Sequence, residues 1–244
     1  MVTAYRLPIR VFVTLLICAG LAGAQQMTAT ASVVVGNKGR KGRPQDAGNV
    51  VVWLAPAEGT AIPQMAAGQS SAHPRLVQRN KSFEPHVLVV RVGSMVEFPN
   101  RDPFFHNVFS LFEGKRFDLG LYEAGSTREV LFDKLGVSYI FCNIHAEMSA
   151  VVVAVNTPYY GISDRRGQIV IPDAAPGRYA LRVWYEGALP ETMNALAREV
   201  TISESSSTLG LLRLPAATPP TEHKNMYGSD YPPPAPGNPA YEHP

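Results

Sequence analysis

Short runs of β-branched and aromatic residues, separated by glycine and proline, recur along this 244-residue chain. The clearest are residues 50–54 (Val-Val-Val-Trp-Leu), 87–92 and 151–155. Such runs with regular turn signals are typical of strands in a β-sandwich. The pattern therefore predicts an all-β fold.

Composition divides the chain into four parts. We expect a leader at residues 1–24, a first β-sandwich at residues 25–156 and a smaller β-sandwich at residues 157–214. In the last part, residues 215–244, nine of thirty residues are proline. A tail of this composition buries too little apolar surface to order itself, so we predict a disordered, Pro-rich tail; a peptide ligand for a partner is the alternative.

The N-terminus has the pattern of a signal peptide. Arg6 and Arg10 precede the apolar run at residues 11–21, and small residues follow up to Ala24. The run is too short for a comfortable membrane span. We expect cleavage before Gln25, export to the periplasm or secretion, and no membrane span in the mature chain; an uncleaved anchor is the alternative.

The charge balance limits the partners. The chain has 22 Lys and Arg against 20 Asp and Glu, and removal of Arg6 and Arg10 with the leader leaves 20 of each. A formally neutral protein lacks the basic excess needed to bind nucleic acid or an anionic membrane surface. Neither is an expected partner.

Three soft or borderline metal donors lie within seven residues: Cys142, His145 and Met148. The other cysteine, Cys18, belongs to the leader, so the mature chain has one thiol and forms no internal disulfide. A buried structural cysteine is the alternative, which the neighbouring donors disfavour. Together with the upstream His106, these residues supply two histidines, one cysteine and one methionine, the ligand set of a mononuclear blue-copper site.

Copper is preferred because this mixture suits both of its oxidation states. Thiolate and thioether favour Cu(I), imidazole binds either state, and a trigonal arrangement suits both. Zinc could occupy a site of one cysteine and two histidines, but it would leave Met148 without a role.

Four segments together resemble the cupredoxin family: residues 98–102 (Phe-Pro-Asn-Arg-Asp), 106–110 (His-Asn-Val-Phe-Ser), 117–122 (Phe-Asp-Leu-Gly-Leu-Tyr) and 142–148 (Cys-Asn-Ile-His-Ala-Glu-Met). The short Cys-x2-His-x2-Met spacing resembles amicyanin and the bacterial periplasmic group often labelled methylamine utilisation protein. The resemblance implies a Greek-key β-sandwich in which His106, Cys142 and His145 are equatorial ligands and Met148 is the long axial one. It also implies that Asn107 ties the two ligand loops together and supports the copper site.

Residues 157–214 resemble the carboxypeptidase regulatory-like, or transthyretin-like, β-sandwich. The resemblance rests on Gly167, Ile169 and Ile171, on Pro-Gly-Arg-Tyr at residues 176–179, and on Val-Trp at residues 183–184. It implies a structural or binding module without catalytic residues.

These observations favour an exported type 1 copper protein that carries single electrons to and from a redox partner protein. One alternative is a copper protein for storage or delivery. Another is a structural or carbohydrate-binding envelope protein with a vestigial copper site. We expect no enzymatic activity, because the chain has no Ser nucleophile elbow, no HExxH motif and no second copper motif.

Overall fold

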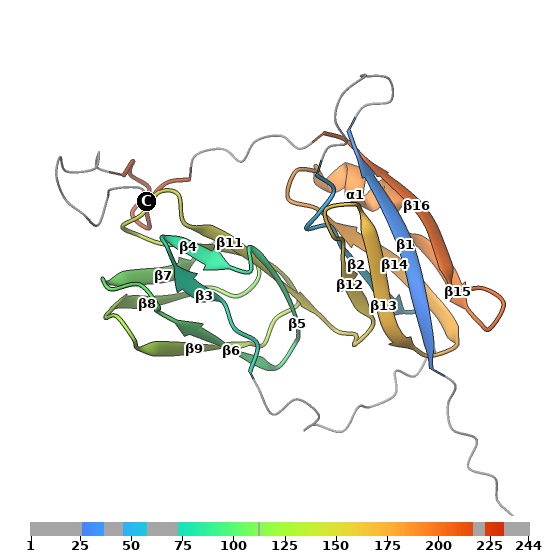
Figure 1. Ribbon diagram of the computed structural model, residues 1–244, viewed down its shortest axis with the longest axis horizontal. Coiled ribbons are helices and arrows are strands. Elements are labelled where there is room, and N and C mark those ends of the chain that lie inside the picture. The colour runs from blue at the N-terminus through green and yellow to red at the C-terminus, as the bar shows by residue number, and fades with distance from the viewer. Residues whose placement is uncertain (1–25, 37–45, 58–72, 112, 217–222, 232–244) are drawn as a thin grey trace, which may run out of the picture.

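The computed structural model describes residues 26–36, 46–57, 73–111, 113–216 and 223–231. The expected leader at residues 1–24 lies outside these ranges. The described chain is mostly β-sheet and forms two β-sandwiches side by side, as predicted from the strand pattern (Figure 1). Among the described residues, no helix has the length and apolarity to cross a membrane.

The first unit is here called the composite sandwich. Its strands come from two parts of the chain, one before and one after the strands of the second unit. One sheet has the order β13 (Gln168–Ala174), β1 (Met27–Val35), β16 (Thr208–Leu214). The other has the order β12 (Tyr160–Ile162), β2 (Val51–Pro56), β14 (Gly177–Trp184), β15 (Arg198–Ile202). A short helix, α1 (Pro190–Leu196), lies between β14 and β15 in the chain.

This pairing differs from the expected boundary at residue 156. We expected β1 and β2 in the first sandwich, but β1 pairs with β13 and β16, and β2 pairs with β12 and β14. The reason is burial: Ala29, Ala31, Val33 and Val35 alternate along β1 and face the core shared with β13 and β16. Residues 157–214 alone form a small unit that would bury little surface. The N-terminal strands complete it.

The second unit, here called the metal-site unit, is therefore inserted between β2 and β12. Its larger sheet has the order β5 (Val87–Arg91), β11 (Ser149–Val155), β10 (Gly136–Phe141), β7 (His106–Ser110), β8 (Phe117–Tyr122). Opposite it lies the pair β6 (Ser94–Pro99) and β9 (Thr127–Phe132), joined through isolated bridges to the hairpin of β3 (Val77–Arg79) and β4 (Ser82–Glu84).

Strand β11 is buried on both faces, which explains its unbroken apolar sequence. Its side chains at 150, 152 and 154 enter the core of the metal-site unit. Those at 151, 153 and 155 pack with Val51 and Trp184 of the composite sandwich. The contact between the units thus fixes the strand that follows residues 142–148.

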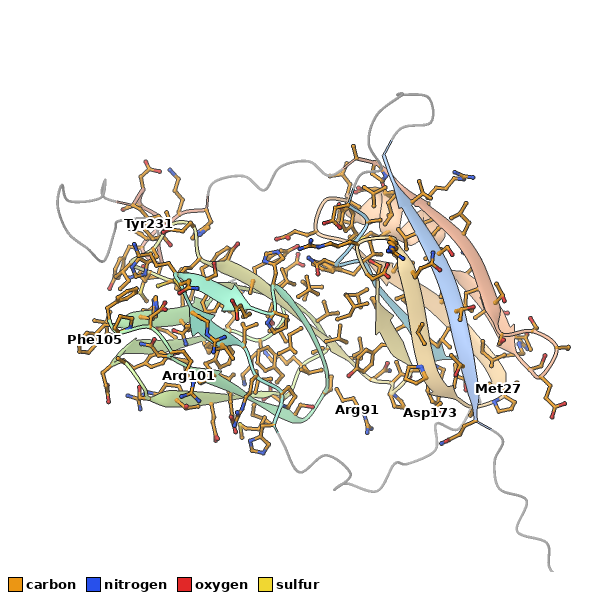
Figure 2. All side chains as sticks on the ribbon, in the orientation of Figure 1. Met27, Arg91, Arg101, Phe105, Asp173 and Tyr231 are labelled. Carbon is orange, nitrogen blue, oxygen red and sulfur yellow. The ribbon has the colours of Figure 1, made fainter. Side chains whose placement is uncertain are left out.

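One segment of the predicted disordered tail, residues 223–231, is described by the structure, while residues 217–222 and 232–244 lie outside the described ranges. Residues 223–231 run beside the end of the metal-site unit, and the Tyr231 hydroxyl donates to the main-chain oxygen of Cys142 at 2.7 Å (Figures 1 and 2). The prediction of disorder is therefore wrong for this segment. It contains no proline and has two tyrosines, so it can form a turn and bury aromatic surface.

Candidate metal centre

Two neighbouring strands bring the upstream histidine to the cysteine. His106 is the first residue of β7, and Cys142 directly follows β10. These strands run antiparallel, with Phe109 paired to Phe141, so the beginning of one lies beside the end of the other. The two donors are 36 positions apart in the sequence, so sheet pairing rather than local sequence brings them together.

The other donors lie on the connection from β10 to β11. The Met148 amide donates to the main-chain oxygen of His145 at 3.2 Å, and the Cys142 amide donates to that of Met148 at 3.2 Å. These bonds close the connection into a compact loop between two paired strands. A seven-residue motif can therefore position its side chains with little freedom.

Cys142 Sγ lies 3.7 Å from Nδ1 of His106 and 3.6 Å from Nδ1 of His145. The three donor atoms lie within 4.8 Å of one another, and all three residues are buried. A metal bound at about 2.3 Å to sulfur and about 2.0 Å to nitrogen, with angles of about 120°, would separate the donors by about 3.7 Å. The geometry thus fits one ion held in a trigonal arrangement by one cysteine and two histidines.

Asp102 determines which nitrogen of His106 faces this centre. Its Oδ2 lies 2.8 Å from His106 Nε2, and a carboxylate can only accept, so Nε2 carries the proton. Nδ1 is then unprotonated and lies 3.7 Å from Cys142 Sγ, so its lone pair is available to a metal shared with the sulfur. Such a carboxylate partner orients a ligating histidine and makes it more basic.

Asp102 was missed in the sequence analysis as a functional residue, although it lies four residues before His106. Its position is fixed by the amides of Asn80 and Lys81, which donate to its two oxygens at 2.6 and 3.0 Å. Burial raises the pKa of the carboxyl, but the Lys81 amide and His106 outweigh it, so the pKa is lower than usual. The carboxylate is therefore charged at neutral pH.

Burial favours the neutral form of each donor. It lowers the pKa of His145 to about 4, with a further contribution from His106, and lowers that of His106 against the effect of Asp102. It also raises the pKa of the Cys142 thiol, which the backbone amides of Ile144, Asn107 and His145 oppose. The imidazoles are thus ready to bind a cation, and three amides are available to stabilise a thiolate.

Met148 is fully buried in the same apolar cluster as Cys142. Its backbone bonds to Cys142 and His145 keep it within the loop. The burial agrees equally with an axial ligand and with a core side chain, so its ligand role stays a prediction.

The side chain of Asn107 makes a different contact from the one expected. Its Nδ2 donates to Asp118 Oδ1 in β8 at 2.8 Å, while its buried Oδ1 has no hydrogen-bond partner among the described residues. It is the backbone amide of Asn107 that reaches the Cys142 thiol. Asn107 therefore supports the cysteine through its main chain, and its side chain joins β7 to β8.

Two adjacent phenylalanines have different surroundings. The Phe104 ring contacts both imidazoles, with ring centroids 5.2 Å from His106 and 5.7 Å from His145. Phe105 is 52% exposed and lies at the end of the unit away from the composite sandwich (Figure 2). Leu121, in β8 and paired with Asn107, is also exposed. The Phe104 ring thus packs against both imidazoles, while the exposed Phe105 is the sequence neighbour of His106 and the exposed Leu121 lies opposite Asn107 in the sheet.

No protein-family model matches the chain, and no curated protein matches it in sequence. Several solved structures resemble part of the chain. A purple cupredoxin from Nitrosopumilus maritimus is 23% identical over 34% of this chain and 99% of its own, with a TM-score of 0.32. A Cu-containing nitrite reductase from Thermus scotoductus SA-01 is 23% identical over 39% of this chain and 25% of its own, with a TM-score of 0.34. An oxidised amicyanin variant is 22% identical over 39% of this chain and 97% of its own, with a TM-score of 0.33. The likeness concerns the fold.

Proposed function

We propose that this chain is a type 1 copper protein that transfers single electrons between redox partner proteins. The observation that carries the proposal is the buried triangle of His106 Nδ1, Cys142 Sγ and His145 Nδ1, with sulfur-to-nitrogen distances of 3.7 and 3.6 Å. One thiolate and two imidazoles in this geometry, with a weak thioether, are the donors that copper prefers in electron-transfer sites.

The surroundings of the triangle support electron transfer over reversible copper delivery. His106 is held by Asp102, the ligand loop is closed by its own backbone bonds, and His145 is only 3% exposed. Rigid, buried ligands change their positions little between the two oxidation states of copper, which keeps the reorganisation energy of electron transfer small. A delivery protein needs ligands that an acceptor can reach, and these are buried.

Copper is proposed rather than zinc because of Met148. A thioether is a soft donor that copper accepts as a long axial ligand and that structural zinc sites do not use. When bound, copper would supply the one-electron couple. His106, Cys142, His145 and Met148 would hold it, and the backbone amides near Sγ would stabilise the thiolate.

The finer assignments from the sequence form part of this proposal. They are an amicyanin-like cupredoxin, export through the leader to the periplasm or secretion, and a carboxypeptidase regulatory-like module at residues 157–214 with a structural or binding role. The protein would transform no substrate. The exposed Phe105 and Leu121 offer an apolar surface beside the site on which a redox partner can dock.

Metal content and the visible spectrum of the mature protein test the proposal. We expect one copper per chain and an intense charge-transfer band from the Cu(II)–thiolate bond, which disappears reversibly on reduction. Copper binding without such a band, together with rapid loss to a mild chelator, would favour storage or delivery. No copper uptake would leave a structural or carbohydrate-binding role.

A further inference from the structure

The C-terminal residues 223–231, here called the clasp, fold into a turn of their own. Asn225 organises it: its Oδ1 accepts from the amides of Tyr227 and Ser229 at 3.0 Å each, and its main-chain oxygen accepts from the Gly228 amide at 2.9 Å. Gly228 has a φ of +78°, which glycine adopts at little cost. An ion pair of Lys224 with Asp230 joins the two ends of the turn. The clasp is thus a defined structure.

The clasp docks on three consecutive residues at the end of β10 and the beginning of the ligand loop. The Tyr231 hydroxyl donates to the Cys142 oxygen at 2.7 Å, and the Met226 amide donates to Asn143 Oδ1 at 2.9 Å. The His223 ring lies on the Phe141 ring at 4.2 Å between centroids and 31° between planes. The two hydrogen bonds join residues that are 83 and 89 positions apart in the sequence.

Tyr231 and His223 also support each other. His223 Nδ1 lies 3.2 Å from the Tyr231 oxygen, and the two rings meet edge to face at 5.3 Å. Because the hydroxyl has one proton and gives it to the Cys142 oxygen, Nδ1 of His223 is the donor in the second bond. The hydroxyl is therefore fixed in one orientation, with its proton directed at the ligand loop.

We propose that the clasp is an intramolecular support of the metal centre, in which Tyr231 and His223 are positioning residues. This inference rests on the proposed copper function. Tyr231 holds the peptide group that follows Cys142, and Met226 holds the next side chain. The amide of Ile144, which faces the thiol, follows directly. The clasp thereby restrains the main chain between Cys142 and His145 and slows the opening through which the metal would leave.

The docking is tested on the metal-free, full-length protein by hydrogen exchange at the Met226 amide. Tyr231→Phe removes the hydroxyl and keeps the ring. Tyr227→Phe is the matched control, because Tyr227 is 79% exposed. We expect Met226 to exchange about tenfold faster in the first variant, as expected from the loss of one hydrogen bond, and at the parent rate in the control. Asn143→Ala, which removes the acceptor of Met226, should also accelerate it. Equal exchange in all four proteins would overturn the clasp.

The positioning role is tested on the copper-loaded proteins. Tyr231→Phe should release Cu(I) to a chelator about tenfold faster, in line with the loss of a group that supports a ligand. It should also lower the reduction potential, because the hydroxyl directs the positive end of its dipole at the Cys142 peptide. Tyr227→Phe should match the parent in both. Faster Met226 exchange with parental release and potential would overturn the positioning role.

These outcomes separate the two proposals. A parent protein without the charge-transfer band would refute the copper function, while the hydrogen-exchange result would still decide whether the clasp docks. A parent with the band, but with a Tyr231→Phe variant that matches it in every measurement, would refute the clasp alone.

Discussion

His106 donates its Nε2 proton to Asp102 Oδ2 over 2.8 Å, and both side chains are almost fully buried. This bond turns Nδ1 of His106 towards Cys142 Sγ. The ligand set therefore extends beyond the metal-binding atoms to a carboxylate that is held in turn by the backbone of Asn80 and Lys81.

Replacement of Asp102 by Asn should weaken copper binding by about 10- to 100-fold, because the amide makes His106 a less basic ligand. The reduction potential should rise, since Cu(II) gains more than Cu(I) from a basic imidazole. Competition with a chelator and voltammetry measure the two effects. Asp133→Asn, at an exposed ion pair with Lys115, is the control and should change neither. Parental affinity in Asp102→Asn would remove Asp102 from the support of the site.

Replacement of Cys142 by Ser should abolish the visible charge-transfer band, because a hydroxyl is a far poorer soft donor than a thiolate. The hydroxyl is also smaller than the thiol it replaces, so the metal-free variant should keep its fold. Absorption of the copper-loaded protein and circular dichroism of the metal-free protein provide the measurements. A band that survives the substitution would show that Cys142 is not the sulfur ligand.

Replacement of Met148 should tune the site without destroying it. Met148→Leu should keep the colour and the copper but raise the reduction potential, because loss of an axial donor destabilises Cu(II) more than Cu(I). Met148→Gln should lower it, since an amide oxygen is a harder donor. Voltammetry measures both, with Met193→Leu in α1 as the control.

If Met148 is only a core side chain, Leu conserves its volume and costs less than about 1.5 kcal/mol of folding stability. Neither substitution would then move the potential, and two variants with the parental potential would exclude an axial role.

A pH-dependent contact joins the two sandwiches. His86 lies between β4 and β5; its Nε2 is 2.7 Å from Glu186 Oε2 of the composite sandwich, and its Nδ1 is 3.2 Å from the Ser149 oxygen. The hydrogen bond with Glu186 raises the pKa of His86 above its usual value, against the lowering effect of burial. The stabilisation of the fold by this His86–Glu186 contact is complete below about pH 6.5, and it is lost as the pH rises through the raised pKa of His86.

Glu186→Gln should therefore lower the melting temperature of the metal-free protein more at pH 6 than at pH 8.5. The effect should stay below about 1 kcal/mol, because solvent screens a partly exposed pair. Glu199→Gln, which breaks the exposed ion pair with Arg178, should show no such dependence on pH. Thermal melts at both pH values decide it, and an equal loss at both would exclude a charged His86 from the contact.

The local sequence was sufficient to predict the longer strands and the three members of the metal triangle, but not the short strands β3, β4 and β12 or the helix α1. Cys142 and His145 share one short loop, so their spacing alone brings them together, and His106 was recognised by its residue type and motif. Asp102 could have been found from its spacing of four residues before His106. Its role depends on the turn between β6 and β7, where Asn100 accepts from the Asp102 amide and donates to the Phe104 oxygen.

The tertiary structure alone decided which strands form which sandwich and what the tail does. An alternating run such as β1 predicts one buried face, but it does not say which sheet will cover that face. The pairing partners of β1 lie more than 130 residues away. The docking of residues 223–231 likewise depends on single atoms, the Cys142 oxygen and Asn143 Oδ1, that are available only once β10 and the ligand loop have formed. The composition of a segment indicates how much apolar surface it can bury by itself. The pairing of β1 and the docking of residues 223–231 instead depend on surfaces that distant parts of the chain supply.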